Sequence, residues 1–125
     1  MRKPNVIFFD TRIIRVTECL MFIQNLYTKL GFPPETQVGL RIEHSGLKGR
    51  ELTNASPDRV MFSRKTTTEN ESASELVTVL GTMSETRVED VRKILEPMFM
   101  LFDFMQFSTS VFEEIVRNFE RGVVR

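Results

Sequence analysis

Residues 11–30 carry the feature that most restricts the fold: an apolar stripe that stops abruptly at a glycine and two prolines. Apolar side chains recur there at steps of three and four residues, the spacing of one face of an α-helix. Gly31 can end a helix, and the prolines after it cannot continue one because proline lacks the backbone N–H. The pattern predicts a helix over residues 11–30, capped by Asp10 or Thr11. The stripe consists of Ile13, Val16, Leu20, Ile23 and Tyr27.

The residues after this helix alternate in polarity instead. In residues 38–44 the apolar residues and His44 fall on one side of an extended chain, which is typical of a half-buried strand. Glycine-containing turns follow, so residues 50–53 are expected to pair back on this strand as a hairpin. Two more strands are expected at residues 59–63 and 76–80, and the polar stretch 64–75 is expected to form a surface loop.

The C-terminal part of the chain is predicted to be helical. Thr86–Glu89 and Ser110–Glu113 each match the capping box, in which the first and last residues satisfy each other's backbone N–H. Pro97 is expected to kink or break the first of these helices. The whole pattern predicts a single α+β domain over residues 1–125, with an antiparallel sheet of three to four strands packed against a long N-terminal helix and a C-terminal helical pair.

Charge and hydropathy limit which partners and which cellular location are expected for the protein. The 125 residues include 17 Lys plus Arg and 17 Asp plus Glu, a formal charge of zero, so the chain as a whole is not expected to bind polyanions strongly. Its apolar runs are too short for a membrane span or a signal peptide. We therefore expect a cytoplasmic protein with no membrane partner.

Few residues are suited to catalysis or metal binding. Cys19 is the only cysteine and lies in the helical stripe, which favours a buried, inert thiol over a reactive nucleophile. His44 is the only histidine, and a packed hairpin side chain is favoured over a general base or ligand. Asp10 and Asp103 lie among phenylalanines, where a carboxylate pKa can rise, although a helix cap and a break between helices are commoner roles. No set of cysteine, histidine and carboxylate residues has metal-ligand spacing, so no transition-metal site is expected. Because the sequence shows no recognisable catalytic site either, we expect no enzyme activity and no cofactor.

Basic side chains gather between residues 41 and 65. The turn Gly46–Arg50 combines two glycines with a lysine and an arginine, which can cradle a phosphate, although its spacing is not that of a P-loop and such turns are common in hairpins. A solvated surface is favoured over a nucleic-acid contact. If nucleic acid binds, the contacts are expected at Lys48, Arg50, Arg59 and Arg64.

Residues 98–107 are the strongest anomaly in composition. The segment is apolar on every side of a helix except at Asp103 and Gln106. Such a helix is either fully buried or shared with a partner, and a domain this small rarely surrounds one helix. We therefore expect self-association or docking here, most simply as a homodimer. The expected interface residues are Met98, Phe99, Phe102, Phe104 and Phe107.

Several stretches together resemble a known protein family. They are Phe9–Arg12, Leu26–Phe32, His44–Arg50, Leu101–Phe104 and Val111–Val116. The combination resembles the C-terminal region of bacterial proteins whose N-terminal part is an Alba-type, Schlafen-like DNA-binding domain, and which are often labelled ATP-binding proteins or transcriptional regulators. The resemblance spans nearly the whole chain. It implies that a nucleic-acid-binding domain precedes this region, and it assigns no catalytic or binding residue.

These observations favour a non-enzymatic accessory domain for oligomerisation or partner docking in a nucleic-acid-associated regulatory protein. The first alternative is a module that binds nucleic acid directly through the hairpin region 41–65. The second is a small-ligand sensor domain with a pocket lined by phenylalanines.

Overall fold

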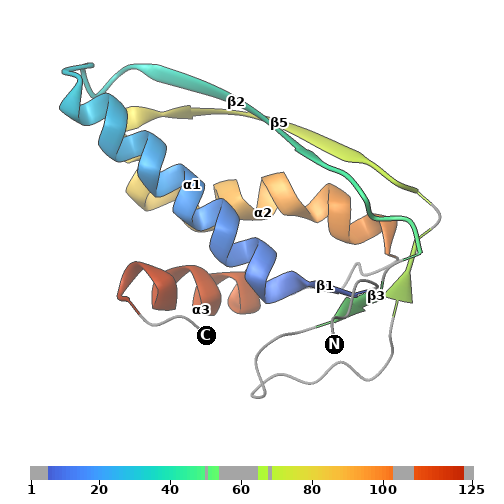
Figure 1. The fold of residues 1–125 in the computed structure, drawn as a ribbon. Coiled ribbons are helices and arrows are strands. Elements are labelled where there is room, and N and C mark those ends of the chain that lie inside the picture. The colour runs from blue at the N-terminus through green and yellow to red at the C-terminus, as the bar shows by residue number, and fades with distance from the viewer. Residues whose placement is uncertain (1–5, 50, 54–64, 68, 103–108, 123–125) are drawn as a thin grey trace.

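The computed structural model describes residues 6–49, 51–53, 65–67, 69–102 and 109–122. The elements are β1 (Val6–Phe8), α1 (Phe9–Lys29), β2 (Gln37–His44), β3 (Glu51–Thr53), β4 (Lys65–Thr66), β5 (Ser72–Val79), a 3-10 turn η1 (Leu80–Thr82), α2 (Met83–Leu101) and α3 (Thr109–Glu120). Helix α2 lies under the ribbon formed by β2 and β5, and it also contacts α1 and α3 (Figure 1). The predicted α+β class is confirmed, whereas one antiparallel sheet of three to four strands is not.

The predicted first helix is confirmed as α1, but its start is not capped as expected. Phe8 is the N-cap residue and no side chain caps the helix. Asp10 instead lies inside the first turn, buried, where its Oδ1 accepts the N–H of Thr11 at 3.0 Å. Because β1 runs directly into α1, the chain enters the helix without the turn that a capping side chain would stabilise.

The end of α1 follows the sequence pattern closely. Gly31 adopts a φ of 91°, in the left-handed region that favours glycine. The N–H groups of Gly31 and Phe32 donate to the carbonyl groups of Thr28 and Tyr27, at 3.1 Å in both cases. This is the Schellman arrangement, and the rings of Tyr27 and Phe32 meet edge to face at 5.3 Å across it.

The ribbon of β2 and β5 is antiparallel and pairs from Gln37 opposite Val79 to His44 opposite Ser72. The strand predicted at residues 38–44 is confirmed, and residues 76–79 of the strand predicted at 76–80 form the end of β5, whereas Leu80 begins η1. The expectation of a loop over residues 64–75 is wrong where β4 and the first half of β5 lie. Two of the positions in β5 that point inward, Ser74 and Thr78, are polar. The alternation of buried and exposed residues in this strand is therefore not an alternation of apolar and polar residues, and it could not be recognised from hydrophobicity. Both are satisfied by α2, because Ser74 donates to the Ile94 carbonyl at 2.7 Å and Thr78 donates to Asp90 at 3.0 Å.

The hairpin expected between residues 50–53 and β2 is wrong. Strand β3 pairs in parallel with β1 and in antiparallel with β4, so it belongs to a second, small sheet. The chain after His44 turns toward the start of α1, and β5 becomes the partner of β2 instead. The strand predicted at residues 59–63 lies outside the described residues.

The C-terminal helices begin earlier than their capping boxes indicate. Helix α2 starts at Met83, which places Thr86 inside it, where its hydroxyl donates to Asp90 at 2.9 Å. Helix α3 starts at Thr109, so Ser110 lies within its first turn. Pro97 does not end α2, which continues to Leu101. Pro97 and Lys93, whose carbonyl loses its helical partner there, are both exposed, so water can satisfy that carbonyl.

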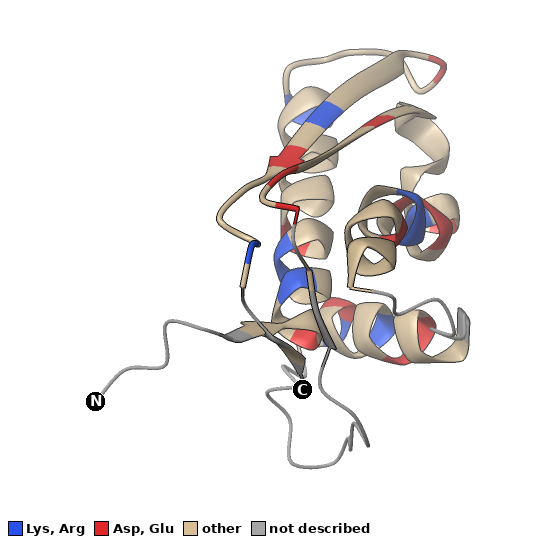
Figure 2. Ribbon diagram, turned by 90° about the vertical axis from the view of Figure 1, so that its right-hand side faces the viewer, with Lys and Arg blue, Asp and Glu red and all other residues tan. Residues whose placement is uncertain are grey.

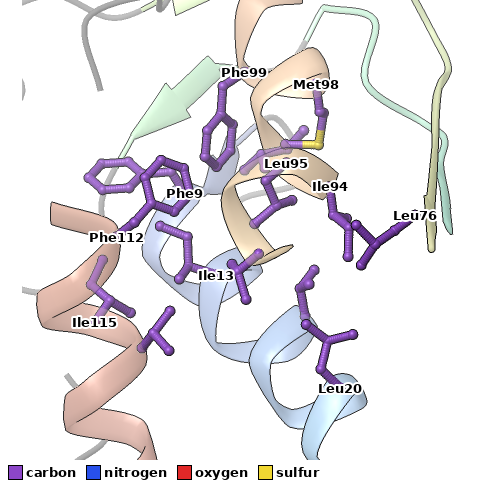
Figure 3. Packing of buried hydrophobic residues seen from close by; sticks show 14 of the residues in the cluster. Phe9, Ile13, Leu20, Leu76, Ile94, Leu95, Met98, Phe99, Phe112 and Ile115 are labelled. Atoms are coloured by element: carbon purple, nitrogen blue, oxygen red, sulfur yellow. The ribbon is translucent and has the colours of Figure 1, made fainter. Parts of the chain in front are cut away.

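The hydrophobic core lies where the three helices meet. Phe9 of α1, Phe99 of α2 and Phe112 of α3 point toward one another (Figure 3), and the rings of Phe99 and Phe112 are 6.1 Å apart. On the other side of α2, Ile94 points toward Leu76 of β5. Helix α2 is therefore the central element, covered by the ribbon and by two helices.

This arrangement corrects the expected dimer interface. Met98, Phe99 and Phe102 are at most 1 % exposed and belong to the domain's own core. The domain does surround this part of α2, because β5, α1 and α3 approach it from different sides. Among the described residues of this stretch, 98–102, only Met100 is strongly exposed, at 49 %. Phe104 and Phe107 lie outside the described residues.

Candidate functional site

The second half of α1 exposes a row of large apolar side chains. Phe22 is 64 % exposed, Leu26 is 40 % exposed and Leu30, just beyond the helix, is 63 % exposed. Residues four apart are neighbours on one side of a helix, so the three form a continuous stripe. Two further exposed side chains lie beyond these three in the chain. Cys19 comes one helical turn before Phe22, and Phe32, which is 47 % exposed, comes two residues after Leu30. We call these five residues, Cys19, Phe22, Leu26, Leu30 and Phe32, the α1 face.

The α1 face exists because the core holds only the first half of the helix. The buried residues of α1 all lie between Phe9 and Leu20, and none of residues 21–30 is buried. Ile23 and Tyr27 pack partly against the core. In Figure 1 no other labelled element lies in front of α1. The exposed fractions of Phe22, Leu26 and Leu30 show that the described residues leave the stripe largely uncovered.

Cys19 corrects a prediction. It was expected to be buried with Val16 and Ile23, yet it is exposed. The buried row runs from Ile13 through Val16 to Leu20, and the step of three residues from Val16 turns Cys19 away from that row. A step of three or four residues from a buried position therefore does not by itself show that a helical residue is buried.

Charged residues flank the α1 face. Glu18 lies near its N-terminal end and Lys29 near its C-terminal end, both exposed. Arg15 also donates to Glu18 at 3.2 Å, with both side chains mostly in solvent. The N-terminal end of the face thus carries Glu18 together with Arg15, and the C-terminal end carries Lys29.

The second candidate site is the pair of Arg12 and His44. His44 is 5 % exposed, as the alternation in β2 predicted, and its Nδ1 lies 3.1 Å from Nη1 of Arg12. Since the guanidinium only donates, Nδ1 must accept, and the proton of the neutral ring is on Nε2. Nε2 is buried without a hydrogen-bond partner. The pair links the end of β2 to the first turns of α1.

Protonation of His44 is disfavoured in the folded state. Burial lowers the pKa of His44 below its ordinary 6.5, and the positive charge of Arg12 lowers it further. The unfolded chain therefore binds a proton more readily, so the free energy of unfolding should fall as the pH drops below about 6.5.

Urea unfolding of the wild type and of His44→Gln from pH 7.5 to 5 measures this. The difference in stability between the two should shrink toward low pH, and a constant difference would contradict the assignment. Because the chain has one histidine, its imidazole NMR signal gives the pKa directly.

A cleft of about 460 Å³ opens beside His44. Its lining is mostly polar and includes Arg41, Glu43, Ser45 and Glu71. A smaller cleft of about 280 Å³ lies between Tyr27, Phe32 and the start of β2. Neither cleft has the lining of several phenylalanines expected of the proposed ligand sensor. The larger one has no phenylalanine and the smaller has one.

The basic hairpin region does not present a basic surface where it is described. Arg41 donates to Glu43 at 2.9 Å and to Glu75 at 3.1 Å, so its charge is compensated. Figure 2 shows acidic and basic residues interspersed on the ribbon and the helices. Lys48 is exposed. The other expected contacts, Arg50, Arg59 and Arg64, lie outside the described residues.

The glycine turn after β2 has a structural role. Gly46 and Gly49 adopt φ of 71° and 78°. The N–H of Leu47 donates to the Asn70 carbonyl at 3.1 Å, and that of Gly49 donates to the Thr67 carbonyl at 3.0 Å. Leu47 itself is fully buried. Because these N–H groups already have partners, they do not form the phosphate cradle that the sequence of the turn suggests.

Metal binding and membrane insertion have no support in the part of the chain that the structure describes. No three side chains of His, Cys, Asp or Glu are grouped there as metal ligands would be. No helix in the same residues has the length and apolarity needed to cross a membrane.

No family model, curated protein or solved structure matches this chain. The resemblance to the C-terminal region of Alba-type, Schlafen-like proteins therefore stays a prediction. The α1 face and the Arg12–His44 pair are the two features on which a function can be argued.

Proposed function

We propose that this chain is a non-enzymatic accessory domain that docks onto another protein surface, for oligomerisation or partner binding, through its α1 face. The observation that carries the proposal is the exposure of Phe22, Leu26 and Leu30 in one row of one helix. The nucleic-acid-associated setting rests on the family resemblance alone.

The energetic argument depends on the alignment of these side chains. A large apolar side chain left in water forgoes roughly 1.5–3 kcal/mol of burial. Single exposed apolar residues are common on protein surfaces, whereas contiguous patches mark interaction sites. Val77 and Met100 are also exposed. Among the described residues, Met100 has no other exposed large apolar side chain on its side of α2, and Val77 has only Val79, which is 36 % exposed, on its side of β5. The α1 face has three such side chains, Phe22, Leu26 and Leu30, in one row and is therefore the better docking surface.

The proposal keeps the docking role inferred from sequence but moves its location. Met98, Phe99 and Phe102 are not available because they are buried in the core. Direct binding of nucleic acid through region 41–65 is less well supported, since Arg41 is paired with two glutamates and the loop N–H groups are bonded internally.

A polar replacement of the stripe tests docking by any partner. The double variant Phe22→Gln, Leu26→Gln keeps the net charge and good helix propensity, so its melting temperature should stay within about 3 °C of the wild type. The protein isolated under native conditions from its own cells should elute in a smaller assembly when it carries these changes. Val77→Gln, exposed at 69 % on β5, is the matched control and should leave the assembly unchanged. An unchanged assembly size in the α1 variant would refute docking through this face.

A further inference from the structure

We infer that the surface docked onto the α1 face is the α1 face of a second copy of this chain, packed antiparallel about a two-fold axis that crosses the stripe at the level of Gln24, on the side of α1 opposite to the Gln24 side chain. This inference rests on the proposed docking function and names its partner. It follows from how the apolar and charged residues are spaced along α1.

The apolar residues are placed symmetrically about Gln24. Phe22 and Leu26 lie two residues on either side of it, about 3 Å along the helix axis in each direction. In an antiparallel pair centred there, each residue lies opposite the one equally far on the other side. Phe22 therefore packs against the partner's Leu26, and Leu26 against the partner's Phe22. The stripe of one copy thereby covers the same stripe of the other copy, and this self-complementarity is what a two-fold interface requires.

The flanks of the stripe match in the same register. Cys19 and Leu30 are eleven residues apart, about three helical turns, so they lie on the same side of α1. Glu18 and Lys29 are also eleven residues apart and lie together on the other side. A two-fold axis perpendicular to both helices keeps like flanks together. Cys19 then meets the partner's Leu30, and Glu18 meets the partner's Lys29.

The charges select the antiparallel orientation over the parallel one. In a parallel pair, the two-fold axis runs along the helices and places the Glu18 flank of one copy against the Cys19 flank of the other, so neither Glu18 nor Lys29 meets an opposite charge. In the antiparallel pair both side chains meet an opposite charge across the interface. The zero net charge of the chain adds no overall repulsion between two copies.

The native cysteine makes this register testable by cross-linking. Leu30→Cys places a second thiol opposite the partner's Cys19, within the Cβ separation of roughly 3.5–4.5 Å that a disulfide needs. Mild oxidation of this variant at micromolar concentration should give a covalent dimer on a non-reducing gel, at least about tenfold faster than the Thr28→Cys control. Thr28 is also exposed, but it lies on the side of α1 that points away from the partner. Cys19→Ser combined with Leu30→Cys should abolish the cross-link, since the two Leu30 positions lie at opposite ends of the pair.

Charge exchange gives an independent measurement on the uncrosslinked protein. Sedimentation of the wild type should approach twice 14.6 kDa. Glu18→Lys or Lys29→Glu should each weaken the dimer about tenfold, because each replaces two attractive contacts by repulsive ones. The double exchange should restore the wild-type affinity.

The outcomes separate this inference from the proposed function. A wild type that stays monomeric up to about 100 µM, or a dimer that Leu30→Cys does not cross-link, overturns the antiparallel α1 pair. Docking on a different partner then still predicts that the glutamine variant shrinks the assembly isolated from cells. If that assembly does not shrink, the docking function itself falls.

Discussion

Replacing Phe99 by alanine is expected to lower the free energy of unfolding by about 3–5 kcal/mol. Phe99 is 1 % exposed and packs at the meeting point of the three helices, with the ring of Phe112 6.1 Å away. Its removal leaves a cavity lined by α1, α2 and α3 that the surrounding backbone cannot close. Chemical denaturation followed by circular dichroism measures the loss.

The neighbouring Met100→Ala variant is the matched control. Met100 lies one residue further along α2 but is 49 % exposed, so its truncation should cost less than about 1 kcal/mol. The comparison also separates a core from an interface. If Phe99 were a dimer contact, Phe99→Ala would change the concentration dependence of unfolding and leave the stability of the dilute monomer nearly unchanged.

Replacing Glu120 by alanine is expected to cost about 3–5 kcal/mol, because it leaves a buried arginine without its counter-charge. The Arg87 side chain is 6 % exposed, and its Nη1 lies 2.7 Å from Oε2 of Glu120. Arg87 also donates to Gln24 of α1, and Arg117 donates to Glu120 at 2.7 Å. The network therefore joins all three helices. Urea unfolding at pH 7 measures the loss.

The protonation of Glu120 supports this expectation. Burial alone would raise the pKa of Glu120, but hydrogen bonds from Arg117 and Arg87 outweigh it and lower the pKa below its ordinary value. The carboxylate is therefore ionised at neutral pH, and its stabilising effect is lost only as the pH falls through that lowered pKa.

Two variants show whether the loss comes from the unpaired charge. Glu113→Ala removes an exposed carboxylate from the same helix and should change the stability by less than about 0.5 kcal/mol. Arg87→Met combined with Glu120→Leu removes both charges and should recover most of the stability lost in Glu120→Ala. Nε of Arg87 is buried without a partner, which makes an apolar replacement easier to tolerate. A double variant as unstable as the single one would mean that packing, rather than charge, dominates at Glu120.

The candidate site was only partly visible in the sequence. The inward position of His44 followed from alternation in β2, but its pairing with Arg12 joins residues far apart in the chain and required the fold. The α1 face does have a local signal in the sequence. Phe22, Leu26 and Leu30 form a second apolar row on a helix whose buried row was already complete.

The sequence by itself determined those helices and strands whose formation depends on residues close together in the chain. Helix α1 and its end followed from side-chain spacing and from Gly31, and β2 followed from alternation, because these patterns depend on neighbours within a few residues. Strand pairing and burial were decided only by the tertiary structure. Strand β3 joined β1 rather than β2, and Phe99 entered the core while Phe22 remained in solvent. Hydrophobicity drives apolar side chains out of water without specifying a partner, so only the positions of the other elements determine which apolar surface they cover.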